Sequence, residues 1–125
     1  MTDRIYEDGM RVRREVLGDD HVDRAEKSKN AFTEDFQDLL TRYAWGEIWT
    51  RPGLDRRTRS FITVAMLVAL GRERELALHL RAALRNGVTA DEIKEVLLQA
   101  AVYCGVPAAN SAFAIAREIL EDSGA

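Results

Sequence analysis

The sequence predicts an all-α protein, a bundle of about six to seven helices. Apolar residues recur every three to four positions along nearly the whole chain, which is the spacing that places side chains on one face of a helix. The chain has only two prolines and eight glycines, and they fall where those periodic segments stop. No run of alternating β-branched residues is bounded by hairpin turns, so the signals of β-strands are missing.

The first expected helix spans about residues 5–17 and ends at Gly18. A charged segment, residues 22–30, leads into a second helix, which we expect over residues 33–45. Its apolar residues at helical spacing are Phe36, Leu39, Leu40 and Tyr43.

A connector is expected at residues 45–53, because Pro52-Gly53 is a turn signal and proline disfavours a helical residue before it. The next helix opens at Asp55 or a neighbour and is apolar on nearly all sides from Phe61 to Leu70. Such a helix belongs in the centre of a bundle or at an oligomer interface.

Residues 73–86 form the next expected helix, and Gly87 closes it. Thr89 and Glu92 have the spacing of a capping box, which starts another helix that ends at Gly105. The apolar face of that helix carries Ile93, Val96, Leu97, Ala100, Ala101 and Cys104.

Pro107 opens a last helix that is rich in small residues. These residues are Ala108, Ala109, Ala112, Ala114 and Ala116. Helices that are apolar all round need more cover than a chain of this size gives them, so we expect a homo-oligomer. Its candidate contact surfaces are this last helix and residues 61–70, and the alternative is a compact monomer with a well-filled core.

The length, net charge and cysteine content of the chain exclude several classes of protein. A chain of 125 residues is expected to form a single domain, residues 1–125. Its net charge of -3 lacks the basic excess of a nucleic-acid binder. Cys104 is the only cysteine, so no internal disulfide or cysteine-based zinc site can form. The sequence shows no signal segment and no apolar run long enough to cross a membrane, so we expect a soluble cytoplasmic protein.

His79 is the histidine with catalytic potential. Within its expected helix it lies on the shoulder of a buried stripe that consists of Leu76, Leu80, Ala83 and Leu84. A half-covered histidine suits a general acid or base, whereas the alternative is an exposed ion pair with Glu75. The other histidine, His21, lies in the charged segment and is expected to be solvated.

Both tryptophans, Trp45 and Trp49, lie in the connector with Glu47 and Arg51. Aromatic walls with a few charged groups suit a small-molecule pocket, although the tryptophans can equally cap the core. Arg59 opens the apolar helix and can hold a carboxylate through two hydrogen bonds.

Three further features complete the reading of the residues. Arg56 and Arg57 are expected to be solvated, and Cys104 is expected to be an inert core residue. The chain contains no phosphate-binding glycine loop, no HExxH and no GxSxG motif, so a catalyst built from it needs no metal, flavin or nucleotide.

Several segments, which together cover nearly the whole chain, carry a family resemblance. The tryptophan segment 43–54 and the apolar helix 59–71 are the longest of them. The others are residues 9–18, 21–24, 78–83, 86–89, 91–99 and 103–112. Together they resemble the γ-carboxymuconolactone (4-carboxymuconolactone) decarboxylase family. The resemblance implies the alkylhydroperoxidase D-like all-α fold and assembly into trimers or hexamers.

The same resemblance implies a carboxy-lyase reaction. The substrate is 4-carboxymuconolactone, which loses CO2 to give β-ketoadipate enol-lactone in protocatechuate breakdown. The peroxidase branch of the superfamily carries a CxxC pair, and here Arg72 and Glu75 occupy those positions. The upstream glutamate of that branch aligns with Ser60, whereas His79 is retained. Disulfide-based peroxidase chemistry is therefore excluded.

The resemblance carries His79 over by motif, as proton donor or as a hydrogen bond to the enolate. The other roles follow from charge and position. Arg51 or Arg59, with Arg81, would hold the carboxylates, and Glu47 would orient or tune a donor. Trp45 and Trp49 would wall the pocket.

Two alternative functions stay open on the sequence. One is a cofactor-free redox relative that uses Cys104 alone, which requires a reactive thiol. The other is a non-catalytic helical assembly module, in which substitutions of His79 or the tryptophans change stability only.

Overall fold

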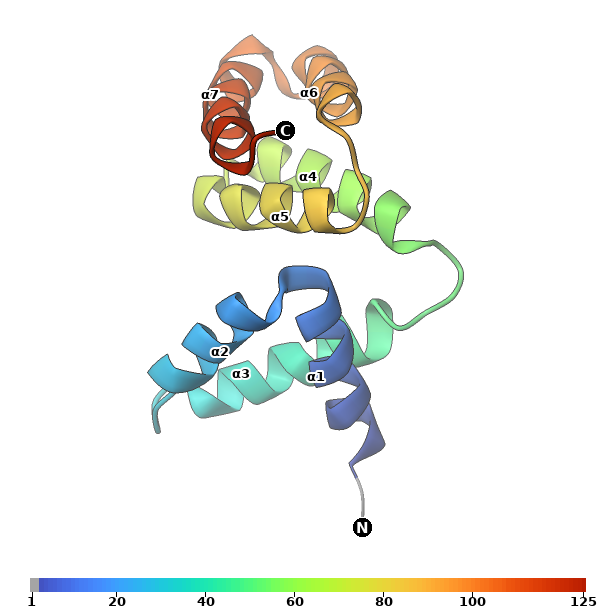
Figure 1. Cartoon of the computed structure of the whole chain (residues 1–125), viewed down its shortest axis with the longest axis vertical. Helices are drawn as coiled ribbons and strands as arrows, with labels where there is room; N and C mark the ends of the chain where they lie inside the picture. Colours follow the sequence, from blue (N-terminus) through green and yellow to red (C-terminus); the bar gives the residue numbers. More distant parts are fainter. Residues whose placement is uncertain (1–2) are drawn as a thin grey trace. The chain divides into compact units, whose positions relative to one another are not determined.

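The computed structural model describes residues 3–125, and this part of the chain contains seven α-helices, one π-helical segment and no strand. The predicted all-α class is therefore confirmed. The chain divides into two compact units, Met1–Asp55 and Arg56–Ala125, which are described here one at a time (Figure 1).

The first unit contains four helical elements. They are α1 (Arg4–Leu17), α2 (Asp19–Ser28), α3 (Glu34–Leu40) and the π-helical η1 (Thr41–Ile48). Helix α1 begins at Asp3, whose side chain accepts a hydrogen bond from the Tyr6 amide, and ends at Gly18 as predicted.

Two expectations for this unit are wrong. The charged segment 22–30 is largely helical, because α2 runs to Ser28. The connector does not begin at Trp45, because the helical backbone continues through η1 to Ile48. The chain has no regular structure from there until α4 begins.

A close approach of two glycines holds α1 against η1. A Cβ atom on Gly9 would lie 2.2 Å from the carbonyl oxygen of Thr41, and one on Gly46 would lie 2.6 Å from the carbonyl oxygen of Ile5. Any side chain at either position would collide with backbone, so only glycine allows the two elements to pack this closely.

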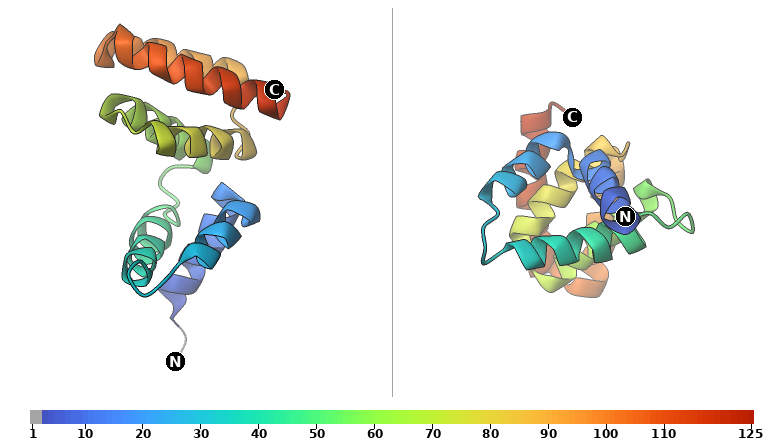
Figure 2. Two further views of the ribbon diagram at one scale, coloured as in Figure 1. Left: turned by 90° about the vertical axis from the view of Figure 1, so that its left-hand side faces the viewer. Right: turned by 90° about the horizontal axis from the view of Figure 1, so that it is seen from below.

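The second unit consists of two packed helix pairs (Figure 2). Its helices are α4 (Arg56–Leu70), α5 (Glu73–Arg85), α6 (Ala90–Cys104) and α7 (Val106–Ser123). Helix α4 packs on α5 and α6 packs on α7, while α5 also contacts α7 and α4 contacts α6. All four helices fall where the sequence predicts them.

The core of the second unit is formed by aliphatic side chains from all four helices. Its fully buried members include Leu76 and Leu80 of α5 and Leu97 of α6. The small side chains of α7 also pack inward, since Ala109, Ala112 and Ala116 are buried. Three of the alanines expected at subunit contacts thus pack inside the chain itself.

The ends of these helices follow the sequence closely. Gly87 and Gly105 adopt φ values of 88° and 98°, which only glycine takes without strain. Thr89 and Glu92 form the predicted capping box, in which each side chain bonds the other residue's amide.

Candidate active site

His79 lies on α5 at the edge of the core. Leu76, Leu80 and Ala83 of the same helix are buried, whereas the His79 side chain is half-buried. This is the shoulder position that the sequence predicts. An imidazole that is covered on one side and reachable on the other can exchange a proton with a bound molecule.

The two arginines predicted in this unit occupy different environments. Arg59, in the first turn of α4, is half-buried, whereas Arg81 on α5 is exposed. Arg81 follows His79 by two residues, and helix positions two apart do not face each other. The structure therefore does not bring Arg81 to the side of α5 that His79 occupies.

Arg57 is ion-paired, so the expectation that it is merely solvated is wrong. Its Nη1 donates hydrogen bonds of 2.8 Å to the carbonyl oxygen of Gly87 and to Oε1 of Glu92, and its Nη2 pairs with Oε2 of Glu92. The guanidinium also lies 5.4 Å from the ring centre of Phe61. Arg57 thus ties the start of α4 to the turn between α5 and α6.

The same contacts change the acidity of Glu92. The Arg57 hydrogen bonds, together with the Thr89 amide, lower the pKa of the Glu92 carboxyl from 4.5 to about 2. Glu92 therefore stays ionised over the neutral and mildly acidic pH range. Its carboxylate binds Arg57 of α4 and caps the first turn of α6 at the same time.

Trp45 and Trp49 form an aromatic pair at the end of η1. Their ring centres lie 5.0 Å apart and the planes are tilted by 35°. Trp45 is buried and Trp49 is half-buried, so one ring packs inward and the other reaches the surface. The other predicted site residues of this unit, Glu47 and Arg51, are exposed.

Arg13 is a residue that the sequence analysis missed. Its side chain is only 4% exposed, and it lies on the buried face of α1 beside Gly9, Val12 and Val16. A helical wheel of residues 4–17 gives the signal, because Arg13 follows Gly9 by one turn within the apolar stripe.

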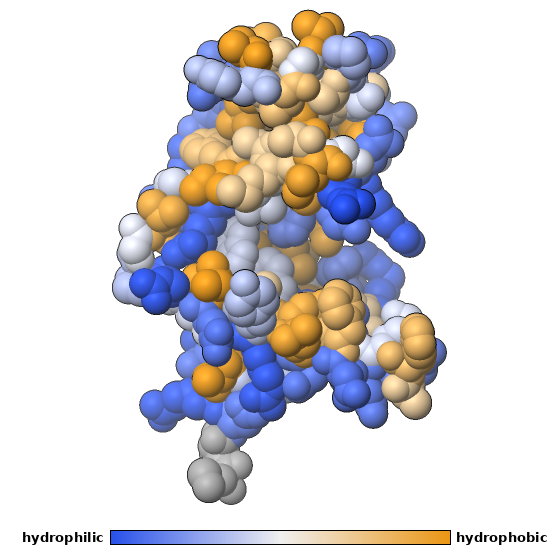
Figure 3. All heavy atoms as spheres, turned by 180° about the vertical axis from the view of Figure 1, so that it is seen from behind, coloured by the Kyte–Doolittle hydropathy of each residue, from blue (hydrophilic) through white to orange (hydrophobic). Residues whose placement is uncertain are grey.

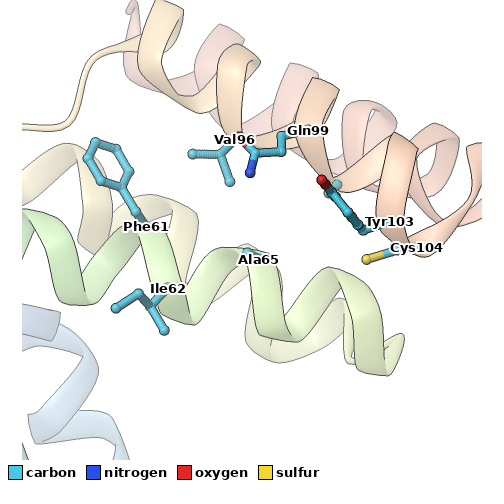
Figure 4. Close-up of a pocket in the computed structure, with 8 residues that line it drawn as sticks. Phe61, Ile62, Ala65, Val96, Gln99, Tyr103 and Cys104 are labelled. Carbon is cyan, nitrogen blue, oxygen red and sulfur yellow. The ribbon is translucent and has the colours of Figure 1, made fainter.

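An apolar groove of about 370 Å³ runs between α4 and α6 (Figure 4). Phe61, Ile62 and Ala65 line it from α4, and Val96, Gln99, Ala100, Tyr103 and Cys104 line it from α6. None of the predicted site residues lines it. Cys104, expected in the core, is half-buried at the wall of this groove.

Residues 3–125 contain neither a candidate metal site nor a candidate membrane span. No group of three or more His, Cys, Asp or Glu side chains is placed to hold a metal ion. No helix in that range is both long enough and apolar enough to cross a membrane.

Comparison with known proteins points in one direction. A model of the carboxymuconolactone decarboxylase family matches residues 34–118. The chain is 53% identical to the 4-carboxymuconolactone decarboxylase of Acinetobacter baylyi over 119 residues, which are 95% of this chain and 89% of that protein. It is 42% identical to nitrosuccinic acid decarboxylase npaB of Metarhizium robertsii over 119 residues, 95% of this chain and 83% of that protein. Both relatives are named as decarboxylases.

Proposed function

The chain belongs to the carboxymuconolactone decarboxylase family, and from that premise we propose that it removes CO2 from 4-carboxymuconolactone. The product is β-ketoadipate enol-lactone. The observation that carries this proposal is the 53% identity to a 4-carboxymuconolactone decarboxylase along 95% of the chain.

The reaction makes three demands on the protein. The departing carboxylate sits on a ring carbon that is conjugated through a double bond to the lactone carbonyl. When CO2 leaves, the electron pair of the broken bond moves onto that carbonyl oxygen as a dienolate, and a proton then adds to the carbon beside the carbonyl. The protein must hold two carboxylates, stabilise the enolate oxygen and deliver one proton. No cofactor is needed, because the substrate itself accepts the electrons.

In the second unit, His79 delivers the proton or donates a hydrogen bond to the enolate oxygen. Its half-buried position on α5 supports this role, since the imidazole is held by the core yet reachable. Arg59, half-buried at the start of α4, holds a carboxylate of the substrate. Arg81 has the weaker support, because it is exposed on a different side of α5.

In the first unit, the half-buried Trp49 ring offers an aromatic surface for the substrate. The buried Trp45 ring packs against the Trp49 ring and supports it. Arg51 is a second candidate for a substrate carboxylate, and Glu47 is a candidate to orient a donor. Both side chains are exposed and do not pack in the core, so both can reach a bound molecule.

The test is turnover of freshly generated 4-carboxymuconolactone by the purified, metal-free protein. CO2 release and enol-lactone formation are followed together, because spontaneous hydrolysis of the lactone releases no CO2. Equal amounts of both products, unaffected by a chelator, support the proposal. A folded protein that releases no CO2 would refute it.

A second substrate class is favoured by the 42% identity to nitrosuccinic acid decarboxylase. Nitrosuccinate also carries two carboxylates, and the nitro group accepts the electron pair of the departing carboxylate as a nitronate. The two reactions make the same demands on the protein. The values of kcat/KM for both compounds decide between them, and turnover of nitrosuccinate alone would replace the lactone as substrate.

The enzyme also forms a homo-oligomer in this proposal. Apolar side chains reach the surface in both units (Figure 3). On α4, Ile62, Met66 and Leu70 are exposed at intervals of four residues, which makes one continuous stripe. We expect a second chain to cover this stripe, and a trimer or hexamer is the expected assembly. A single cysteine fits a reducing compartment such as the cytoplasm.

A further inference from the structure

Arg13 is a buried cation whose partners are mostly uncharged. Its Nη2 donates to Oε1 of Gln37 at 3.2 Å, and its Nη1 reaches Oγ1 of Thr41 at 3.5 Å. The nearest carboxylate oxygen, Oε1 of Glu26, is 4.0 Å from Nη1, and Glu26 also pairs with Lys29 at 2.9 Å. Among the described residues, no acceptor is bonded to Nε.

This arrangement is a poor ion pair, since burying a charge costs free energy that a distant, shared carboxylate offsets only in part. Burial accordingly lowers the pKa of Arg13. A methionine, which has a similar volume although it is shorter, would fill much of the space on α1 without that cost. An arginine at this buried position is therefore better explained by the groups that its hydrogen bonds hold in place.

What Arg13 holds is the point where α3 becomes η1. Gln37 lies in α3 and Thr41 is the first residue of η1, one helical turn later. The Thr41 hydroxyl donates to the Gln37 carbonyl oxygen at 2.8 Å, which leaves its lone pairs for Arg13. The Thr41 carbonyl lies against Gly9. Helix α1 thus contacts both the hydroxyl and the carbonyl oxygen of Thr41.

The backbone register at Thr41 decides where the tryptophans point. A π-helix bonds residues five apart, whereas an α-helix bonds residues four apart. A change of register at Thr41 would rotate every later side chain about the helix axis, and Trp45 and Trp49 follow Thr41 by four and eight residues. The Thr41 hydroxyl is oriented by its bond to the Gln37 carbonyl, and Arg13 contacts both that hydroxyl and the Gln37 side chain, so it links α1 to the last turn of α3 and to the first residue of η1.

We infer that Arg13 is a positioning residue, which fixes the π-helical register of η1 and so the placement of the Trp45–Trp49 pair. It does not touch the reacting atoms. The effect on catalysis rests on the proposed function, whereas the effect on the tryptophan pair does not.

The test compares Arg13→Met with the control Arg11→Met. Arg11 lies on the same helix but is exposed, and among residues 3–125 its ion pair is with Asp8 alone. Trp45 and Trp49 are the only tryptophans in the chain, so tryptophan fluorescence excited at the red edge and the near-ultraviolet circular dichroism report on η1 directly.

We expect Arg13→Met to keep its far-ultraviolet helical signal but to lose the near-ultraviolet band of the tryptophan pair. Its kcat/KM should fall by up to about 10²-fold, the loss expected when a binding group is misplaced by about 1 Å. Arg11→Met should change neither. Arg13→Lys should restore little, because an ammonium cannot reach Gln37 and Thr41 in the same geometry.

If Arg13→Met does not fold, Thr41→Val decides, because it removes the hydroxyl at nearly constant volume. A changed tryptophan spectrum in Thr41→Val supports the inference. An unchanged spectrum in a folded Arg13→Met, or in Thr41→Val, overturns it. If the lactone is not a substrate, the spectra still give the answer.

Discussion

After CO2 leaves, a proton has to reach the carbon beside the lactone carbonyl, and His79 is the residue to which we assign its delivery. Glutamine keeps a similar volume and one hydrogen-bond donor but cannot transfer a proton. We predict that His79→Gln lowers kcat by about 10²–10⁴-fold, the usual contribution of a general acid. Steady-state kinetics on the lactone, with light scattering to check the assembly, measures this.

The matched control is His21→Gln, which changes the other histidine of the chain. His21 is half-buried on α2 and should leave kcat unchanged. If His79→Gln retains normal turnover, His79 does not transfer the proton, and another proton donor must be sought.

The ion pair of Arg57 and Glu92 makes the free energy of unfolding depend on pH. The folded protein holds the Glu92 pKa near 2, below its ordinary value of 4.5, so the unfolded chain binds the proton more readily. This contribution to stability is fully present above about pH 4.5 and is lost as the pH falls toward 2. We predict that Glu92→Gln flattens the decline of the unfolding free energy in that range.

Denaturant unfolding at several pH values between 2 and 6 measures this effect. Glu95→Gln, an exposed carboxylate on the same helix, serves as the control and should keep the wild-type slope. Equal slopes in Glu92→Gln and the wild type would mean that the Arg57 contacts do not stabilise the folded state.

At this scale, the sequence predicts positions on a helix better than partners in space. The shoulder position of His79 follows from the spacing of its neighbours on one helix. The contact of Arg57 with Glu92 joins residues 35 positions apart, so no local pattern contains it. Arg13 could have been recognised as buried, whereas its bonds to Gln37 and Thr41 could not.

At the scale of the elements, the packing of η1 on α1 leaves no room for a Cβ atom at Gly46. An alanine at position 46 would place its Cβ atom 2.6 Å from the Ile5 carbonyl and 2.9 Å from Cγ2 of the same residue. Because backbone cannot move aside cheaply, we predict that Gly46→Ala lowers the unfolding free energy by about 1–3 kcal/mol. Chemical denaturation measures it.

Gly53→Ala is the matched control, since no atom lies within 4 Å of a Cβ atom built there. That substitution should be neutral or stabilise by up to about 1 kcal/mol through the unfolded chain. Equal effects of the two substitutions would show that α1 and η1 do not pack as closely as described.

The elements of the second unit were predictable because each carries its own signals, from the capping box of α6 to the proline at the start of α7. Helix α2 was missed because only Val22 is buried along its ten residues, so its apolar signal is weak. The π-helical register of η1 depends on the approach of α1, which local spacing does not encode.

At the scale of the whole molecule, we predict that the chain assembles through the exposed apolar stripe on α4. Met66 lies at its centre and is 59% exposed in the single chain. We predict that Met66→Lys shifts the protein to a smaller species, since a charge would have to be buried at the subunit contact. Sedimentation or light scattering over a range of concentrations measures this.

Met66→Leu keeps the stripe apolar and should assemble normally. A wild-type protein that stays monomeric, or a Met66→Lys variant that assembles like the wild type, would remove α4 from the interface.

The organisation of the whole chain is visible in the sequence less clearly than its helices. A single domain, residues 1–125, stays a prediction, and the structure describes two compact units that meet in sequence at Asp55 and Arg56. The segment before α4 has a Pro-Gly turn but no long flexible linker, so composition gives no boundary there. The family match, residues 34–118, includes parts of both units.

The contact between Gly9 and Gly46 also has a consequence during synthesis on the ribosome. At a rate of about 5–20 residues per second, Gly46 is added roughly two to seven seconds after Gly9. Because the ribosomal exit tunnel holds the most recently added residues, α1 emerges before η1, and its apolar face has no η1 to pack against until η1 has also left the tunnel. Slow synonymous codons after Gly46 would delay the emergence of η1 and lengthen that exposure, so we expect messages that encode the same protein to differ in how much of it aggregates.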